Sequence, residues 1–381
     1  MESLEDQQST ATERRQTAEI VLEVQSLTKV FGGKQEVTAV DDVSFEVEEG
    51  EFLSIIGPSG SGKSTILHII AGFVEPTAGS VILDGVDVTD TPPFDRATNM
   101  MFQDLALFPN YDVAGNIAFG LRQDGVPKAK RQERVEEMLR VIELEGYGDR
   151  KIDELSGGER QRVALARCLV KDPKVILLDE PLASLDRRLR QNMTTELKRI
   201  QERTGSTFLY VTHDQEVALA VSDRTIVLKD GAIEQIGTSD DLYQKPASRF
   251  VGDFVGDMNM FEHDIVVGDG ATQQSHRLTN GPIQVGPESL NGLQRGEEKT
   301  VTIGVRPHHI EIVEETDEPG YYLQGAVESQ TFHGKSSVVN VETDKGVIAV
   351  ETTERLDLGD AVTLRFTPSN FHVFDTETTY A

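Results

Sequence analysis

The sequence predicts an α/β domain built on a mostly parallel sheet, followed by a separate all-β domain of barrel type. Two observations predict the first domain: short, continuously apolar strands alternate with helical stretches, and a glycine-rich loop joins one such strand to a helix. Alternation of this kind is typical of a parallel sheet covered on both faces. The second domain is predicted because the helical periodicity disappears after about residue 257, where short strands alternate with turns.

The first domain is expected over residues 20–252, the second over residues 253–381, and a polar, disordered tail over residues 1–19. A helix is expected at residues 129–146, where apolar residues recur at helical spacing. Strands of the first domain are expected at residues 20–24, 43–47, 52–56, 175–178, 207–211 and 225–228. Strands of the second are expected at residues 300–305, 323–327, 337–341, 347–350 and 361–366.

The chain is strongly acidic. It has 381 residues, of which 65 are acidic and 37 basic, and its formal net charge is −28. A surface of this charge argues against nucleic-acid binding. The remaining alternatives are an acidic recruitment surface for a cationic partner and a halophilic adaptation to a salty cytoplasm. Because the acidic residues are spread over the whole chain, we favour the second.

The cellular location follows from what the sequence lacks. A membrane-spanning helix needs about 20 apolar residues in a row, and no such stretch occurs. The polar N-terminus has no apolar segment of a secretory signal. A single cysteine, Cys168, excludes an internal disulfide and is expected to be a small buried side chain. We therefore expect a cytoplasmic protein whose membrane role, if it has one, is peripheral.

The glycine-rich loop fits a phosphate-binding pattern, G-x-x-x-x-G-K-[ST], in the strand–loop–helix context that this pattern requires. Its glycines let backbone N–H groups converge on a polyphosphate such as that of ATP, and the helix start adds partial positive charge. The lysine is expected to reach the β- and γ-phosphates, and the serine after it to bind Mg²⁺. The loop comprises Gly57, Pro58, Ser59, Gly60, Ser61, Gly62, Lys63, Ser64 and Thr65.

Polar side chains follow three other predicted strands. Asp179 and Glu180 end one strand, His213 follows a second, and Gln103 follows the segment 99–102. Ligands of parallel sheets lie at the carboxyl ends of strands. We expect Asp179 to hold Mg²⁺ through water and Glu180 to orient the attacking water or accept its proton. His213 is expected to contact a γ-phosphate, and the Gln103 amide to touch Mg²⁺ or water.

A second helix start also suits an anion. Ser156 and Glu159 form an S-x-x-E capping box. Gly157 and Gly158, which follow the cap, cost helix stability but let backbone N–H groups approach an anion. The chain's own nucleotide already occupies the first loop. This helix start is therefore expected to bind a nucleotide held by another copy of the chain.

Taken together, these motifs resemble the nucleotide-binding domain of ABC transporters. The resemblance covers about residues 20–252 and implies a P-loop NTPase fold with a helical subdomain at about residues 104–172, followed by a small OB-type barrel. It also implies a homodimer that closes on ATP. The matching motifs are Walker A at 57–65, the Q-loop at Gln103, the signature at 155–161, Walker B at 175–180, the D-loop with Asp186 at 184–186, the switch histidine His213, and Phe31 as the aromatic residue that stacks on adenine.

The second domain resembles the transport-associated OB-type domain of importer ATPases, whose signature matches residues 303–307. This resemblance implies separate permease transmembrane subunits, an extracellular substrate-binding protein, and a position at the cytoplasmic face of the membrane. A coupling helix of the permease is expected to dock beside residues 102–109. The junction at residues 254–261 resembles spermidine/putrescine importer ATPases. Ferric iron, sugar or another small solute remain alternative cargoes.

Two rival classes are less compatible with the sequence. Soluble ABC proteins of DNA repair or translation usually carry a zinc hook or tandem ABC units, whereas this chain has one ABC unit and an appended barrel. A scaffolding protein with structural ATP does not require Glu180 and His213, which are both present.

A halophilic origin of the acidity predicts that molar KCl stabilises the fold, because salt screens the repulsion between the acidic side chains. Thermal unfolding measured from low to molar KCl is expected to show a steep rise in the midpoint temperature. A flat dependence would remove this interpretation and favour a local acidic docking surface.

Overall fold

The computed structural model describes residues 19–33, 36–267, 283–285, 298–315 and 320–375. The chain divides into two compact units, and the boundary along the sequence lies between Asp240 and Asp241. Helices α9 (Ser239–Gln244) and α10 (Arg249–Phe254) therefore lie mostly or wholly in the second unit. The family boundary at residue 252 stays a prediction, and nearly all of the predicted tail lies outside the described residues.

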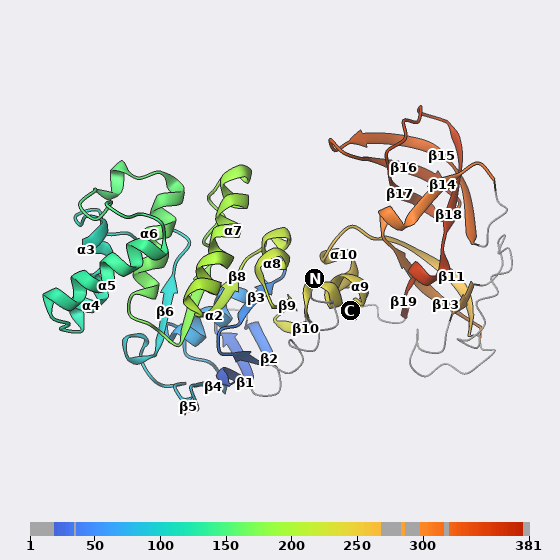
Figure 1. Ribbon diagram of the computed structural model, residues 1–381. Coiled ribbons are helices and arrows are strands. Elements are labelled where there is room, and N and C mark those ends of the chain that lie inside the picture. Colours follow the sequence, from blue (N-terminus) through green and yellow to red (C-terminus); the bar gives the residue numbers. More distant parts are fainter. Residues whose placement is uncertain (1–18, 34–35, 268–282, 286–297, 316–319, 376–381) are drawn as a thin grey trace, which may run out of the picture. The chain divides into compact units, whose positions relative to one another are not determined.

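A six-stranded sheet forms the centre of the first unit (Figure 1). Strands β9, β3, β8, β7 and β6 run parallel to one another, and β10 pairs antiparallel with β9 at the edge. The inner strands are buried, as their continuous apolar sequences predict. In sheet order the strands are β10 (Ala232–Gly237), β9 (Arg224–Lys229), β3 (Phe52–Ile56), β8 (Thr207–Val211), β7 (Val175–Asp179) and β6 (Thr98–Met101).

A second, antiparallel sheet belongs to the same unit. Its apolar face shares one core with residues of β3, β7, β8 and β9 and with the apolar face of α2. One strand, β2, runs past the glycine-rich loop, and this position matters for the site. In sheet order the strands are β2 (Val37–Glu48), β1 (Ile20–Phe31), β4 (Ala78–Leu83) and β5 (Val86–Asp87).

The helices of the first unit surround the central sheet. Helices α3 to α6 gather at one end of the unit (Figure 1). They lie within residues 104–172, where a helical subdomain is predicted. A second core joins them to one face of the sheet. The helices are α2 (Lys63–Ala71), α3 (Val113–Ile117), α4 (Phe119–Gln123), α5 (Lys128–Val141), α6 (Gly157–Leu169), α7 (Arg187–Thr204) and α8 (Gln215–Val221), with short 3₁₀ turns η1 (Pro93–Asp95) and η2 (Ile152–Glu154).

After α9 and α10, the rest of the second unit is an all-β domain of two sheets around one apolar core, as the sequence predicts for an OB-type barrel. The first sheet has the order β12 (Ile283–Val285), β11 (Asn259–Val267), β13 (Glu298–Val305) and β19 (His372–Asp375). The second has the order β14 (Ile310–Val313), β18 (Ala361–Phe366), β15 (Tyr321–Phe332), β16 (Ser337–Thr343) and β17 (Gly346–Thr352). Turns η4 (Pro307–His309) and η5 (Pro368–Asn370) complete it.

A fully buried arginine fixes α9 and α10 to this domain. Arg306 donates hydrogen bonds to the backbone oxygens of Gly252, Gly256 and Tyr243 and stacks on the Tyr243 ring at 4.1 Å. These carbonyls lie in or just after the two helices. An unpaired buried carbonyl costs about 1–3 kcal/mol. The guanidinium of Arg306 removes this cost at several carbonyl groups at once.

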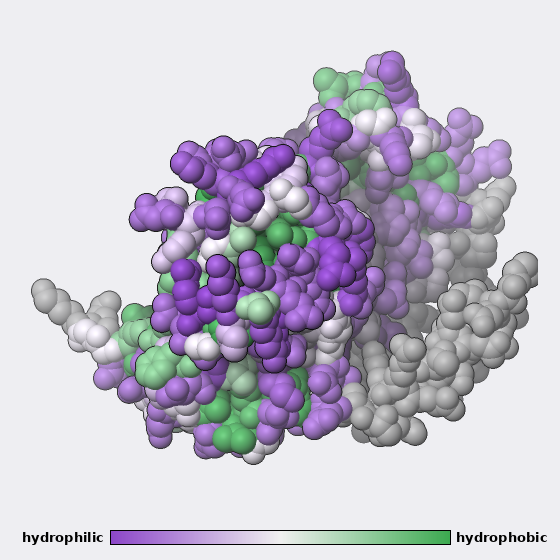
Figure 2. Space-filling model, turned by 60° about the vertical axis from the view of Figure 1, so that its left-hand side comes forward, coloured by the Kyte–Doolittle hydropathy of each residue, from purple (hydrophilic) through white to green (hydrophobic). Residues whose placement is uncertain are grey.

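One face of the molecule is mostly polar (Figure 2). Figure 2 shows mostly hydrophilic side chains on one face, with apolar side chains in small separate groups. Among the described residues, no helix combines the length and the apolar sequence needed to cross a membrane. Cys168 is buried, as expected, and burial raises the pKa of its thiol to about 11.

Candidate active site

The order of the central sheet brings four of the predicted segments to one edge. Strands β3, β8 and β7 are parallel neighbours, and β6 pairs with β7. The glycine-rich loop follows β3, Glu180 follows β7, His213 follows β8 and Gln103 follows β6. Because parallel strands present their carboxyl ends at the same edge, the loop and the polar side chains converge there.

Two glycines fix the path of the loop. Gly62 caps α2 in the left-handed region, at φ 97°, and a Cβ atom there would lie 2.2 Å from the carbonyl oxygen of Ala39 in β2. A Cβ atom on Gly57 would lie 2.3 Å from the carbonyl oxygen of Leu228 in β9. Both positions therefore exclude every side chain. The loop is pressed against the backbone of two strands, and α2 begins directly at Lys63.

Lys63 lies inside the curve of this loop and is 6% exposed. Its ammonium group donates to the carbonyl oxygens of Gly57 and Pro58, at 2.8 and 2.7 Å. Burial lowers the pKa of Lys63, while the carboxylates of Glu180 and Asp179 act in the opposite direction. The side chain is therefore a cation held by the loop itself, with two acidic groups close by.

Ser64 and Asp179 meet at the start of α2. The Ser64 hydroxyl donates to Oδ1 of Asp179 at 3.1 Å, and Nε2 of His68 lies 3.5 Å from Oδ2. Burial raises the pKa of Asp179, and the hydrogen bond from Ser64 opposes this. A hydroxyl and a carboxylate side by side are hard oxygen donors of the kind that Mg²⁺ prefers. Within the described ranges, no group of three or more His, Cys, Asp or Glu side chains is arranged to hold a metal.

Glu180 and His213 form the second polar pair. Oε2 of Glu180 lies 3.0 Å from Nδ1 of His213, and the side chains are 21% and 56% exposed. Glu180 has a left-handed backbone, with φ 45°, and its N–H donates to the carbonyl oxygen of Val211 at 2.9 Å. A left-handed conformation is rare for a residue with a side chain and is often found at functional sites. The left-handed conformation of Glu180 turns the chain sharply at the end of β7.

The remaining predicted residues of this edge are more exposed. Gln103 is exposed beyond β6 and takes part in no hydrogen bond among the described residues. Phe31, at the end of β1, is 43% exposed, and the Lys29 ammonium group lies 5.0 Å from its ring centroid. An exposed ring is available for stacking. The roles of Phe31 and Gln103 in nucleotide binding stay predictions.

The capping box predicted at the start of α6 is present. Ser156 accepts from the Glu159 N–H at 3.4 Å, and Oε2 of Glu159 accepts from the Ser156 N–H and hydroxyl, both at 2.7 Å. These hydrogen bonds lower the pKa of Glu159.

Helix α6 packs closely against α7. A Cβ atom on Gly158 would lie 3.1 Å from the Leu189 side chain of α7, so the glycine permits this close packing. Asp186 caps α7 by accepting from the Leu189 N–H at 3.0 Å.

Three side chains of this region are not among the predicted site residues. His68 contacts Asp179, Arg190 binds Asp214 at 2.8 Å, and Gln161 donates to the carbonyl oxygen of Pro181 at 2.7 Å. His68 follows Ser64 by four residues and so shares its helix face, which is a signal that the sequence contains. The contacts of Arg190 and Gln161 depend on how distant segments pack and have no local signal.

Comparisons with known proteins agree with this geometry. The family model "ABC transporter" matches residues 40–183, and the model "TOBE domain" matches residues 303–374. A "Spermidine/putrescine import ATP-binding protein PotA" of Mesorhizobium japonicum is 45% identical over 327 residues, which are 85% of this chain and 87% of that protein. The protein of the same name from Ruegeria pomeroyi is 42% identical and covers 91% of this chain and 94% of its own length.

The chain belongs to the ABC transporter family of ATP-binding proteins. A solved dimeric structure of an ATP-binding cassette in a post-hydrolysis state, bound to ADP and Pi, is 35% identical, with a TM-score of 0.50. It covers 57% of this chain and 98% of its own. The predicted family, the P-loop fold with an appended OB-type domain, and the ATPase activity of an ABC transporter subunit are thereby confirmed.

A substitution at Gly62 tests the loop of this ABC protein. In Gly62→Ala, the new Cβ atom meets the Ala39 carbonyl, so the loop is expected to move and to weaken ATP binding by about 10-fold or more, since such strain costs about 1–3 kcal/mol. Titration with a fluorescent ATP analogue measures this. The matched control is Gly60→Ala, because Gly60 also has a positive φ of 84° but open space around the position of its Cβ atom. An equal loss of ATP affinity in both variants would show that the packing of Gly62 against β2 does not determine nucleotide binding.

Proposed function

We propose that this chain is the ATP-hydrolysing subunit of an ABC importer that takes up spermidine and putrescine. The observation that carries the catalytic part is the convergence of the Lys63 loop, the Ser64–Asp179 pair and the Glu180–His213 pair at one sheet edge. The cargo is proposed because relatives that are 37–45% identical are named as spermidine/putrescine import ATP-binding proteins. Ferric iron, sugar or another small solute are the alternative cargoes.

The loop residues bind the triphosphate of ATP. Backbone N–H groups of residues 59–65 surround the phosphates, and the start of α2 adds partial positive charge. Lys63 exchanges the carbonyl oxygens of Gly57 and Pro58 for phosphate oxygens, which are better partners for a buried cation. Ser64, Asp179 and Gln103 are the groups that would hold Mg²⁺. When bound, Mg²⁺ neutralises charge that develops on the phosphates.

Glu180 and His213 act on the water that attacks the γ-phosphate. Glu180 orients the water and accepts its proton, because its carboxylate lies at the end of β7 beside the loop. His213 holds Glu180 at 3.0 Å and is exposed enough to reach a γ-phosphate oxygen. Charge stabilisation and positioning of this kind account for most catalysis of phosphoryl transfer.

Dimerisation completes the site. Ser156 caps the helix that begins with Gly157 and Gly158, and a helix start leaves backbone N–H groups that can bind an anion. We propose that they cover the ATP held by the loop of a second copy. Phe31 stacks on the adenine, and Asp186 lies in the segment that faces the other copy. ATP binding therefore closes two identical chains, and hydrolysis opens them.

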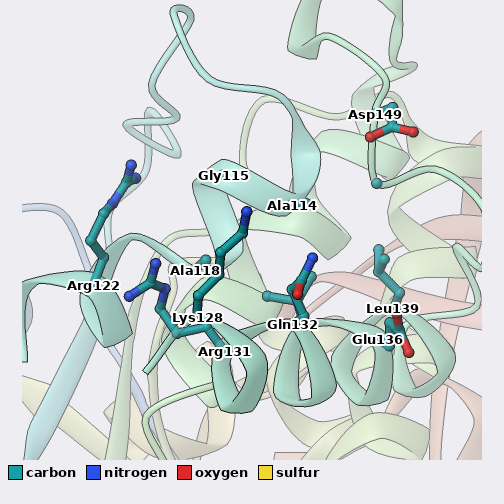
Figure 3. A pocket seen from close by; sticks show the side chains of 12 residues that line it. Ala114, Gly115, Ala118, Arg122, Lys128, Arg131, Gln132, Glu136, Leu139 and Asp149 are labelled. Carbon is teal, nitrogen blue, oxygen red and sulfur yellow. The ribbon is translucent and has the colours of Figure 1, made fainter. Parts of the chain in front are cut away.

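A permease helix is proposed to dock beside residues 102–109, as the sequence predicts. A pocket of about 340 Å³ in the helical subdomain, which these residues do not line, is a second proposed docking site. Its walls carry small and apolar residues of α3 to α5, among them Ala114, Ala118 and Val135. Figure 3 shows the cationic side chains toward one end of the pocket and Glu136 and Asp149 toward the other. The cations at this end are Arg122, Lys128 and Arg131.

The shape and the charge of this pocket suit an amphipathic permease helix with an acidic end. With such partners, and with an extracellular substrate-binding protein in the same system, the chain works at the cytoplasmic face of the membrane.

Replacement of the proposed base tests the chemistry. Glu180→Gln removes the carboxylate but keeps the shape, so kcat is expected to fall by about 10²- to 10⁴-fold while Mg-ATP still binds. Because bound ATP is not consumed, the variant is expected to accumulate as a dimer in size-exclusion chromatography with Mg-ATP. Glu202→Gln, an exposed carboxylate on α7, is the control. Wild-type turnover in the Glu180 variant would exclude this role.

Uptake measurements test the cargo. Cells that lack this gene are expected to lose uptake of radiolabelled spermidine and putrescine, and to regain it with the wild-type chain but not with Lys63→Ala. Ferric iron and maltose uptake are measured in the same cells. If polyamine uptake is unaffected and one of these falls instead, the importer is correct and the polyamine assignment is wrong.

A further inference from the structure

Arg190 connects the two segments that carry the catalytic pair. The first segment runs from Glu180, at the end of β7, to Asp186, the N-cap of α7. The second runs from the end of β8 through His213 to Asp214, the N-cap of α8. Arg190 lies one turn into α7 and its side chain is 32% exposed.

The two ends of its guanidinium bind different segments. Nη1 donates to Oδ2 of Asp214 at 2.8 Å, and Nη2 donates to the carbonyl oxygen of Leu185 at 3.0 Å. The other carboxylate oxygen of Asp214 accepts from the Val217 N–H at 3.1 Å and caps α8. The Asp214 N–H in turn donates to the hydroxyl of Thr212 at 3.0 Å. Asp214 is therefore held from three sides.

His213, by contrast, is held weakly. Its side chain is 56% exposed, and Glu180 is its one polar partner among the described residues. The position of its ring therefore depends on the backbone between Thr212 and Asp214. The contact between Arg190 and Asp214 fixes this backbone on the C-terminal side of His213. The hydrogen bond from the Glu180 N–H to the carbonyl oxygen of Val211 fixes it on the N-terminal side.

We propose that Arg190 is a positioning residue for hydrolysis, which sets the distance between Glu180 and His213 by joining Leu185 to Asp214. This inference rests on the proposed roles of Glu180 and His213 and deepens them. Arg190 is not expected to touch ATP. Its planar fork suits the task because one side chain satisfies a carboxylate and a backbone carbonyl at once, which a lysine ammonium does with less geometric control.

The same segment is tied on its other side to α6. Gln161 donates to the carbonyl oxygen of Pro181, and Gly158 packs closely against Leu189, the neighbour of Arg190. The segment between Glu180 and Asp186 is therefore fixed to α6 through Gln161 and to the His213 segment through Arg190. These two contacts form a continuous chain of hydrogen bonds from α6 to the His213 segment.

Steady-state ATPase kinetics of the full chain test the proposal. For Arg190→Gln, kcat is expected to fall by about 10- to 100-fold, as for other small displacements of catalytic groups, while KM for Mg-ATP changes by less than about 3-fold. Arg190→Lys is expected to restore part of kcat, since it keeps the pairing with Asp214. Arg199→Gln is the control, because Arg199 is an ion-paired arginine of the same helix, bound to Glu143 and Glu196. Unchanged kcat in Arg190→Gln would overturn the proposal.

A second variant covers the case in which Arg190→Gln does not fold. Asp214→Asn keeps the helix cap, because asparagine caps as well as aspartate, but it loses the charge that binds Arg190. Its kcat is expected to fall with KM preserved, and the double variant is expected to be no worse than the more impaired single variant. Additive losses, or an Asp214→Asn chain as active as wild type, would refute the connection. A wild-type chain that does not hydrolyse Mg-ATP would instead refute the proposed function.

Discussion

The whole site depends on the close approach of the loop backbone to two strands. Gly57 lies against the Leu228 carbonyl of β9, and Gly62 lies against the Ala39 carbonyl of β2. Because neither position can accept a side chain, the loop has one path, and α2 starts with Lys63 and Ser64 pointing at the carboxyl edge of the sheet. Both layers of the first unit thus contribute to a single phosphate site.

The parallel order of the strands then supplies the chemistry. Neighbouring strands β3, β8 and β7 end side by side, so residues far apart in sequence become neighbours: Ser64 meets Asp179, and Glu180 meets His213. The Ser64–Asp179 hydrogen bond is part-buried, whereas the His213 side chain of the second pair is 56% exposed. A nucleotide would enter an array that is already assembled, which reduces the reorganisation needed at the moment of reaction.

Much of this could be predicted from the sequence because its signals are local. Strands at residues 207–211 and 361–366 have the predicted bounds, and the capping box of Ser156 and Glu159 forms as expected. The contacts of Arg190 and Gln161 could not be predicted, because they depend on which helix packs against which strand end. The closeness of Gly62 to Ala39 also depends on the position of β2, which no motif specifies.

A structure of the chain with Mg²⁺ and a non-hydrolysable ATP analogue would show whether this array binds and aligns the nucleotide. Lys63 is expected to leave the carbonyl oxygens of Gly57 and Pro58 for the terminal phosphates, and Glu180 is expected to face the γ-phosphorus. The Ser156 helix start of a second copy is expected over the same phosphates. A loop without nucleotide, or a bound nucleotide with Glu180 turned away from its terminal phosphorus, would contradict the account.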